Sequence, residues 1–269
     1  MAKMWQPKPL LLLVAVSLGA LACTVAGGKP LVTAISKDPS TLLYGFSVPV
    51  MEHGGPTNQI VLDLSGPLTW TICPPEHVRL ECTSVACMQA HRFAPTNFPH
   101  TGNGKPDGEH CKCTAHPHNP VSGETPSGDM THVTSYANTT DGKNPLYVVP
   151  VELTTSCAPV SLLSSLPAGA IGVAGLARSD LALSAQVAKT QKVENIFALC
   201  LPFVEMKGED KQAGYGSGGG TEAPAMVIGG FQMEHNLLVF DEENQRLGFS
   251  SLLLFRQTTC NNFNFTMAA

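Results

Sequence analysis

Short apolar runs separated by turn residues dominate the chain and predict strands. Residues 58–70 (NQIVLDLSGPLTW) are rich in β-forming residues. One face of this segment is apolar by the period-2 alternation of a strand: Ile60, Leu62 and Leu64. Residues 145–155 (PLYVVPVELTT) predict a second strand, in which Pro150 favours an edge or a bulge because proline donates no ladder hydrogen bond.

Helical spacing is clearest at residues 179–193, where Ser179 is a candidate N-cap and Asp180 suits the first turn. Other short apolar runs predict strands at residues 197–201, 225–228, 237–240 and 247–254. The last two flank the polar turn 241–246, which predicts a hairpin. Residues 73–121 are dense in Cys, Pro, His and Asn, so we expect loops there.

Composition narrows the fold class to a turn-rich, mostly β protein. Of the 269 residues, 43% are hydrophobic and only 14% are charged, against about 25% in an average soluble domain. This excludes a disordered charged tail, and 25 Gly with 21 Pro argue against a helical bundle or coiled coil. The net charge of −5 offers no basic footprint for nucleic acid. The length allows one large or two small domains.

The N-terminus has the pattern of a secretory signal peptide. Lys3 and Lys8 precede the apolar run 10–22, which is too short to span a bilayer. Cleavage after Ala22 or after Ala26 fits the small-residue rule. We prefer residues 1–26 as the signal, since this removes Cys23 and leaves an even number of cysteines. The protein is then extracellular, with no membrane span.

Secretion decides how the cysteines are interpreted, because oxidising compartments favour disulfides. Eight remain after cleavage: Cys73, Cys82, Cys87, Cys111, Cys113, Cys157, Cys200 and Cys260. Cys82 and Cys87 are close enough to close a small loop, and Cys260 must pair across the fold or stay free. Eight cysteines allow about 105 pairings, so the sequence does not fix them.

A metal site is the alternative use of some of these cysteines. Residues 109–113 (EHCKC), with His116 and His118, place two Cys and three His within nine residues, and such side chains bind zinc. Because secretion favours disulfides, we expect no metal and no other cofactor.

Two further motifs carry less information. Asn138 and Asn264 begin N-x-Thr sequons and are predicted glycosylation sites in a secreted chain. Residues 207–221 contain a match to G-x-G-x-x-G, but no strand precedes it and a flexible linker explains it better.

One segment resembles a known catalytic loop. Residues 63–70 (DLSGPLTW), followed by Cys73, resemble the first active-site loop of pepsin-like aspartic proteases. Further resemblance is carried by AIGVAGL, VIGGFQME, LVFD and RLGF, at residues 170–176, 227–234, 238–241 and 246–249. Residues 33–39, 119–123, 137–142, 176–183 and 258–266 are similar to plant TAXI-type xylanase inhibitors, extracellular dermal glycoproteins and basic 7S globulins. The resemblance covers about residues 29–266.

This resemblance implies a pepsin-like β-barrel fold with a complete N-lobe and a largely missing C-lobe. N-lobe blocks continue to Pro202, and Phe203 then starts a block that lies near the end of the C-lobe in the family. We therefore divide the chain into a signal peptide (1–26), an N-terminal lobe (29–202) and a C-terminal remnant (203–269) containing the linker 207–221.

Catalysis is not expected from this sequence. The aspartic mechanism needs two carboxylates that share a proton. Asp63 can supply the first, but Ser65 replaces the Gly of the motif, and no second Asp-Thr-Gly or Asp-Ser-Gly exists. The position of the family's flap tyrosine corresponds best to His118. Asp63 is thus interpreted as vestigial, with residual endopeptidase activity as the alternative.

The resemblance also implies the partner. These inhibitors bind microbial endoglycanases, xylanase or xyloglucanase, in plant defence. The His of the xylanase inhibitors corresponds here to Leu254, and the Arg of the glucanase-inhibiting relatives to Gln257, with Arg256 one position earlier. A cation facing two catalytic carboxylates would block them. The remaining alternative is a non-functional, truncated glycoprotein.

Overall fold

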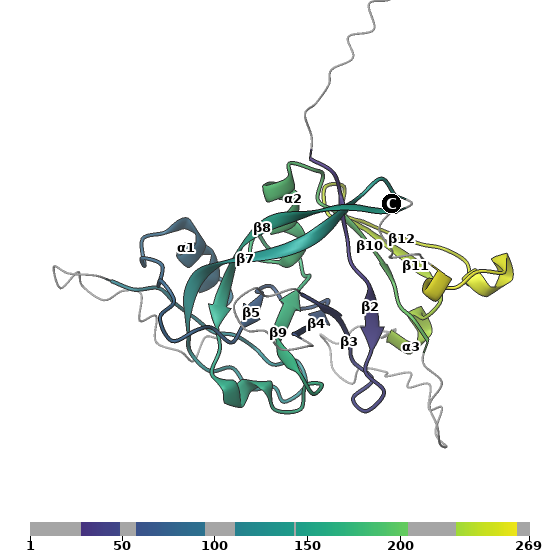
Figure 1. The fold of residues 1–269 in the computed structure, drawn as a ribbon. Coiled ribbons are helices and arrows are strands. Elements are labelled where there is room, and N and C mark those ends of the chain that lie inside the picture. Colours follow the sequence, from purple (N-terminus) through teal and green to yellow (C-terminus); the bar gives the residue numbers. More distant parts are fainter. Residues whose placement is uncertain (1–27, 49–57, 95–110, 143, 204–229, 263–269) are drawn as a thin grey trace, which may run out of the picture.

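The computed structural model describes residues 28–48, 58–94, 111–142, 144–203 and 230–262 (Figure 1). Strands of the larger sheet are β1 (Leu31–Val32), β2 (Ile35–Lys37), β3 (Tyr44–Ser47), β4 (Gln59–Asp63), β5 (Trp70–Thr71), β6 (Thr114–Ala115), β7 (Gly128–Thr140), β8 (Pro145–Cys157) and β9 (Ala170–Gly175). A smaller sheet contains β10 (Ile196–Cys200), β11 (Leu237–Asp241) and β12 (Arg246–Phe249). The helices are α1 (Val85–His91), α2 (Leu183–Gln191) and α3 (Gly230–Met233), with 3-10 turns η2 (Val160–Leu163), η3 (Leu253–Arg256) and η4 (Cys260–Asn262).

The larger sheet has nine strands in the order β1-β7-β8-β5-β9-β4-β3-β2, with β6 beside β7. It curls around its own core, as Figure 1 shows for β7 and β8, which cross over β5 and β9. The neighbours β4 and β9 run parallel, as do β5 and β8, while the other pairs are antiparallel. The mostly β class expected from composition is confirmed.

Strand β4 confirms the strand predicted near residue 60, with one correction. Ile60 and Val61 point to opposite faces, and both are buried in apolar clusters. A strand covered on both faces needs no alternation of apolar and polar residues. Leu64 was expected on the apolar face, but it is 38% exposed because the chain leaves the sheet after Asp63.

The predicted strand at 145–155 is the middle of β8, which pairs with β7 over most of its length. Pro150 faces Tyr136 of β7, whereas the pairing with β5 reaches only Ser156 and Cys157. At Pro150, β8 therefore has a partner strand on one edge only. This position suits proline, which has no N–H to donate to a second strand. Strand β7, which is rich in Thr and Ser, was not predicted from the sequence.

The structure differs from the sequence prediction at both α1 and α2. The helix expected at 179–193 is α2, and its N-cap is Ala182, without a side-chain cap. Ser179 instead accepts a hydrogen bond from the N–H of Leu181, in the turn before the helix. Helix α1 lies in the region expected to be loops, where Ser84 caps it by accepting the N–H of Cys87.

The predicted C-terminal hairpin is confirmed as β11 and β12, with Asp241 facing Arg246. Its second strand is shorter than expected, because β12 ends at Phe249 and the 3-10 turn η3 follows. The strand expected at 197–201 is β10, which is partly exposed and pairs with β11. The strand expected at 225–228 lies outside the described residues.

Among the described residues, no helix is both long and apolar enough to cross a membrane. The predicted signal peptide, residues 1–26, lies outside the described residues.

Candidate functional site

The turn after β4 holds the aspartate identified from the sequence. Asp63 pairs with Gly175 at the ends of the parallel strands β4 and β9. The carbonyl oxygen of Asp63 accepts the N–H of Leu176 at 2.8 Å and that of Gly66 at 3.3 Å. The backbone therefore fixes Asp63 where two parallel strands end together.

Two glycines make this turn possible. A Cβ on Gly66 would lie 2.7 Å from Oδ2 of Asp63, and a Cβ on Gly175 would lie 2.3 Å from the carbonyl oxygen of Gly66. Neither distance is sterically allowed. The turn and β9 can lie this close together because both positions at the contact are glycine. This close packing positions the carboxylate of Asp63.

The Asp63 carboxylate is 7% exposed and uses its two oxygens differently. Its Oδ1 accepts the N–H of Ser65 at 2.9 Å and the hydroxyl of Ser65 at 2.7 Å. Its Oδ2 accepts no hydrogen bond from the described part of the chain. The replacement of glycine by Ser65, noticed in the sequence, thus gives Asp63 a hydroxyl donor of its own.

A cavity of about 240 Å³ opens in front of Asp63. The described residues that line it are Asp63, Ser65, Gly66, Pro67, Leu68, Ala90, Phe93, His116, His118 and Thr125. Asp63 is the one carboxylic acid in that set. Since a proton-sharing dyad needs two, these side chains do not assemble the aspartic mechanism.

Two histidines, more than fifty residues after Asp63 in sequence, also line this cavity. His118, expected at the flap position, lines it and bonds Thr125 through Nδ1 at 2.8 Å. The indole N–H of Trp70 donates to the carbonyl oxygen of His118 at 2.8 Å, which fixes this segment. Burial lowers the pKa of His116, so its ring is neutral at neutral pH.

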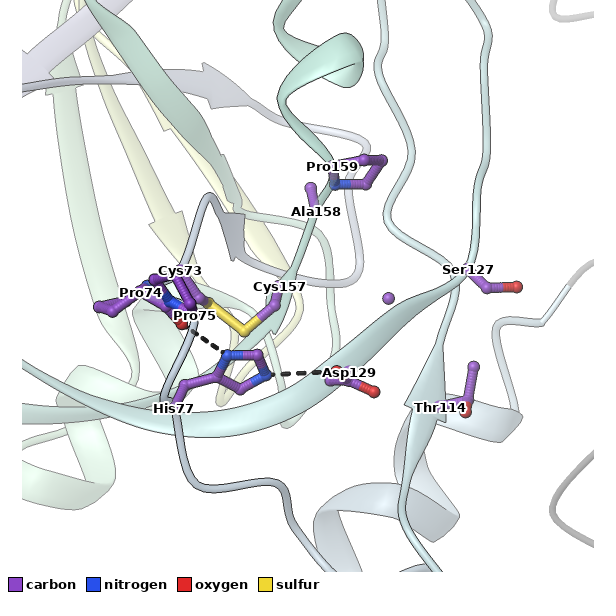
Figure 2. Close-up of a pocket in the computed structure, with 11 residues that line it drawn as sticks. Cys73, Pro74, Pro75, His77, Thr114, Ser127, Asp129, Cys157, Ala158 and Pro159 are labelled. Atoms are coloured by element: carbon purple, nitrogen blue, oxygen red, sulfur yellow. Dashed lines mark hydrogen bonds and ion pairs between the residues drawn. A yellow bond between two sulfur atoms is a disulfide. The ribbon is translucent and has the colours of Figure 1, made fainter.

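A second cavity, of about 370 Å³, was not predicted from the sequence (Figure 2). His77 lies inside it with both ring nitrogens engaged, Nδ1 with the carbonyl oxygen of Pro74 at 2.8 Å and Nε2 with Asp129 at 3.3 Å. Arg79 also contacts Asp129, at 3.0 Å. Both ring nitrogens of His77 are thus engaged, and these contacts hold the loop that carries His77 against β7.

The expected pairing of the eight cysteines is confirmed. The disulfides are Cys73–Cys157, Cys82–Cys111, Cys87–Cys113 and Cys200–Cys260. The suggestion that Cys82 and Cys87 close a small loop is wrong. Each of them pairs instead with one cysteine of the Cys-Lys-Cys segment that precedes β6. Cys260 pairs across the fold, as one of its two alternatives required.

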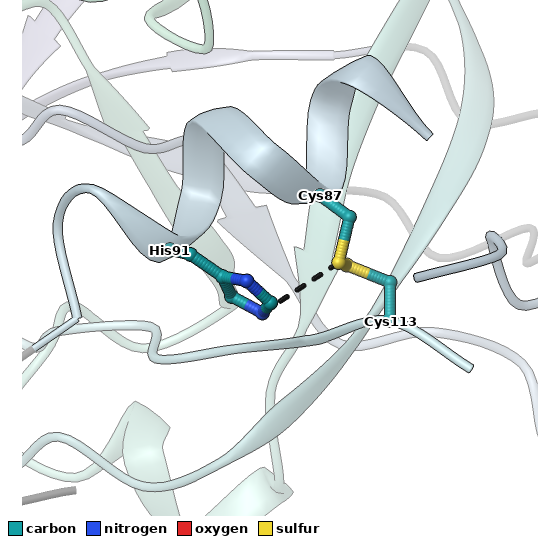
Figure 3. A group of neighbouring side chains, drawn as sticks. All are labelled: Cys87, His91 and Cys113. Atoms are coloured by element: carbon teal, nitrogen blue, oxygen red, sulfur yellow. Dashed lines mark hydrogen bonds between the residues drawn. A yellow bond between two sulfur atoms is a disulfide. The ribbon is translucent and has the colours of Figure 1, made fainter. Parts of the chain in front are cut away.

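The structure also bears on the metal alternative. Cys87, His91 and Cys113 bring their potential ligand atoms within 4.8 Å of one another (Figure 3). The two sulfurs are bonded to each other, and His91 Nε2 lies 3.7 Å from the Cys87 sulfur. Metals bind thiolates, so this group acts as a disulfide with a neighbouring imidazole. Glu109 and His110 lie outside the described residues.

The residues predicted to contact a glycosidase lie in and after η3, which follows the smaller sheet. Leu254 is 49% exposed, and Arg256 and Gln257 are also exposed. Arg256 forms no ion pair with any described residue. These residues are near neighbours in sequence on one exposed segment, and none of them lines the Asp63 cavity; their contact with a glycosidase stays a prediction.

The predicted glycosylation sites differ in position. Asn138 is half-buried inside β7, where it faces Val32 of β1 and Val148 of β8. Asn264 lies outside the described residues. Glycosylation at both stays a prediction.

A model of the family described as "Xylanase inhibitor N-terminal" matches residues 50–217. The chain belongs to this xylanase-inhibitor family. A curated relative, "Chitinase CLP" of Oryza sativa subsp. japonica, is 36% identical over 401 residues, which cover 90% of this chain and 93% of the rice protein. Since this family member has 269 residues, long stretches of the rice protein align with none of its residues.

Solved structures show the same fold. The crystal structure of EDGP matches with a TM-score of 0.70 and 20% identity, covering 89% of this chain and 98% of EDGP. Conglutin gamma, a basic 7S globulin from lupine seeds, matches with a TM-score of 0.66 and 17% identity, covering 88% and 99%. The resemblance to these proteins inferred from sequence motifs is therefore confirmed.

Proposed function

We propose that this xylanase-inhibitor family member is a secreted, non-catalytic protein that binds and inhibits microbial endoglycanases, xylanase or xyloglucanase, in plant defence. The observation that carries the proposal is the single carboxylate of the Asp63 cavity. Without a second acid among the lining residues, the pocket that cleaves peptides in aspartic proteases has no dyad, and family membership then favours binding over cleavage.

The inhibitory contact is assigned to the segment of η3. Glycosidases act through two carboxylates that flank the scissile bond. The guanidinium of Arg256 is exposed and free of intramolecular ion pairs in the described chain, so it is available for such a pair. Phe255, 81% exposed, extends the apolar part of the same surface. A charge-assisted, bidentate hydrogen bond would block the enzyme's acids.

Secretion is supported by the four disulfides, since such bonds persist in oxidising compartments. We also propose that residues 203–269 are the remnant of a C-lobe that lost its middle part. The unmatched stretches of the rice relative support this division. Sequencing the transcript across codons 201–204 tests it, because a longer transcript would show that the short chain is not the native product.

The inhibition test titrates the purified protein into xylanase and xyloglucanase assays. We expect a concentration-dependent loss of activity that is weakened at least tenfold by Arg256→Ala. Arg92→Ala, an exposed arginine at the end of α1, is the matched control and should inhibit like the wild type. Unchanged glycosidase activity over a wide concentration range would reject the proposed function.

The name of the rice relative suggests hydrolysis of chitin as a second candidate function. The same preparation is therefore assayed on chitin oligosaccharides and on a peptide substrate with and without pepstatin. Hydrolysis that Asp63→Asn abolishes would replace the inhibitor proposal with an enzyme.

A further inference from the structure

One oxygen of the Asp63 carboxylate, Oδ2, makes no hydrogen bond to the described residues, and Asp63 lines a cavity. The residue is 7% exposed, and Ser65 occupies only Oδ1. Buried charges in proteins are normally paired, because desolvation without a partner is costly. Oδ2 has no such partner among the described residues, and it is not one of their fully buried unpaired atoms, so it is open to solvent on a residue that lines the cavity. The site thus holds an acceptor for a ligand.

A metal ion does not fit this acceptor. Within the described chain, one group alone brings three potential ligand atoms within 4.8 Å of one another, and it is the Cys87–His91–Cys113 group. Asp63 does not gather with His116 and His118 in this way. The described side chains around Asp63 thus form no such three-ligand group, and a hydrogen-bond donor suits Oδ2 better than a coordinated metal ion.

The electrostatics of the cavity favour a positively charged donor. Burial lowers the pKa of His116, so its imidazole does not neutralise Asp63 at neutral pH. His118 and Thr125 are hydrogen-bonded to each other. A cationic donor adds Coulomb attraction to its hydrogen bond with a carboxylate, which a neutral donor does not.

The walls favour a short alkyl chain behind that charge. Leu68 and Ala90 are buried apolar residues that line the cavity, and Phe93 lies at a more open place, 41% exposed. An aromatic ring beside a cation adds attraction. The volume of about 240 Å³ is below the usual range for drug-sized ligands, so the occupant is small.

We propose that this cavity binds a small alkylamine or alkylguanidine, with the cationic group on Oδ2 of Asp63 and the carbon chain against Leu68, Ala90 and Phe93. Asp63 is the one carboxylate among the described residues that line this cavity, and an unpaired carboxylate attracts a cation. This inference goes beyond glycosidase binding and does not depend on it, because η3 lies elsewhere on the surface.

Calorimetric titration of the whole protein with agmatine and with n-butylamine tests the site. We expect saturable binding of both, and at least tenfold weaker binding of 1-butanol, which has the same shape without the charge. Asp63→Asn keeps the side-chain size and should weaken amine binding at least tenfold. Glu124→Gln removes an exposed carboxylate that does not line the cavity and should leave binding unchanged.

Folding of each variant is checked by near-ultraviolet circular dichroism. Should Asp63→Asn fail to fold, Phe93→Lys provides an independent test, because Phe93 is partly exposed and its replacement brings an internal ammonium to the cavity. This variant should lose amine binding while keeping its fold. No binding at millimolar amine, equal binding of 1-butanol, or undiminished binding by a folded Asp63→Asn or Phe93→Lys variant would overturn the proposal.

Discussion

The ammonium group of Lys37 lies 2.6 Å from Oε1 of Glu234, and the two residues are 197 positions apart in sequence. The hydroxyl of Tyr44 donates to the same oxygen, also at 2.6 Å. Burial, together with the hydrogen bond to Glu234, raises the pKa of Tyr44 well above its ordinary value, so the phenol keeps its proton. This buried group joins β2 and β3 to the end of α3.

Glu234→Ala is expected to destabilise the fold by about 3–5 kcal/mol, because it leaves the ammonium of Lys37 buried without its partner. Urea unfolding followed by tryptophan fluorescence measures the change. The exposed pair of Lys112 and Glu81 is the control, and Lys112→Ala should cost only about 0–1 kcal/mol. Equal effects of the two substitutions would contradict the assigned role of burial.

Gly175→Ala is expected to cost at least about 1–3 kcal/mol in unfolding free energy. Its Cβ would lie 2.3 Å from the carbonyl oxygen of Gly66 and 2.7 Å from that of Leu68, and backbone atoms must move to make room. Gly248→Ala is the control, since its nearest neighbour, a carbon of Val239, is 3.7 Å away. The control should change stability by less than about 0.5 kcal/mol.

Protein stability is expected to fall below about pH 6.5, in part through His116. Burial lowers the pKa of this residue in the folded state, so the unfolded chain binds the proton more tightly. The contribution of His116 to the free energy of unfolding is complete above its pKa in the unfolded chain, and it is lost as the pH falls below that pKa. His116→Gln should therefore reduce the drop in Tm between about pH 7.5 and about pH 5, measured by calorimetry. His132→Gln, which replaces an exposed histidine, is the control. If the drop in Tm is as large in His116→Gln as in His132→Gln, the assignment to His116 is wrong.

The edge strand β12 is expected to promote self-association. Leu247 is 57% exposed and Phe249 is 77% exposed, on a strand that pairs with β11 alone among the described elements. Open apolar edges template further strands, and a lysine blocks them. Phe249→Lys should lower the fraction of large species seen by light scattering. Val160→Lys removes an equally exposed apolar residue from a 3-10 turn and should have little effect.

Local sequence patterns predicted those elements whose structure depends on near neighbours. The hairpin of β11 and β12 follows from two apolar runs around a polar turn, and β8 from its β-branched residues. Helix α1 was missed because Cys and His suggested loops, whereas Ser84 provides a cap and the disulfide of Cys87 provides the packing. Strand β7 was missed because its Thr and Ser side chains carry no apolar alternation.

The candidate site divides in the same way. Asp63 and its missing partner were identified from the motif itself, and Ser65 was noticed there as a substitution. The resemblance placed His118 at the flap position, whereas His116, from the same segment more than fifty residues after Asp63, was not identified as a residue of this cavity. Contacts at such separations depend on register and closure of the sheet, which a single sequence does not contain.

The disulfide between Cys200 and Cys260 joins two residues sixty positions apart and closes the chain between them into a covalent ring. Any single peptide bond broken inside that ring leaves both fragments attached, so the protein keeps its mass under non-reducing conditions. The fragments separate only after the disulfide is reduced. An intact band on a non-reducing gel is therefore no proof of an intact chain for this protein.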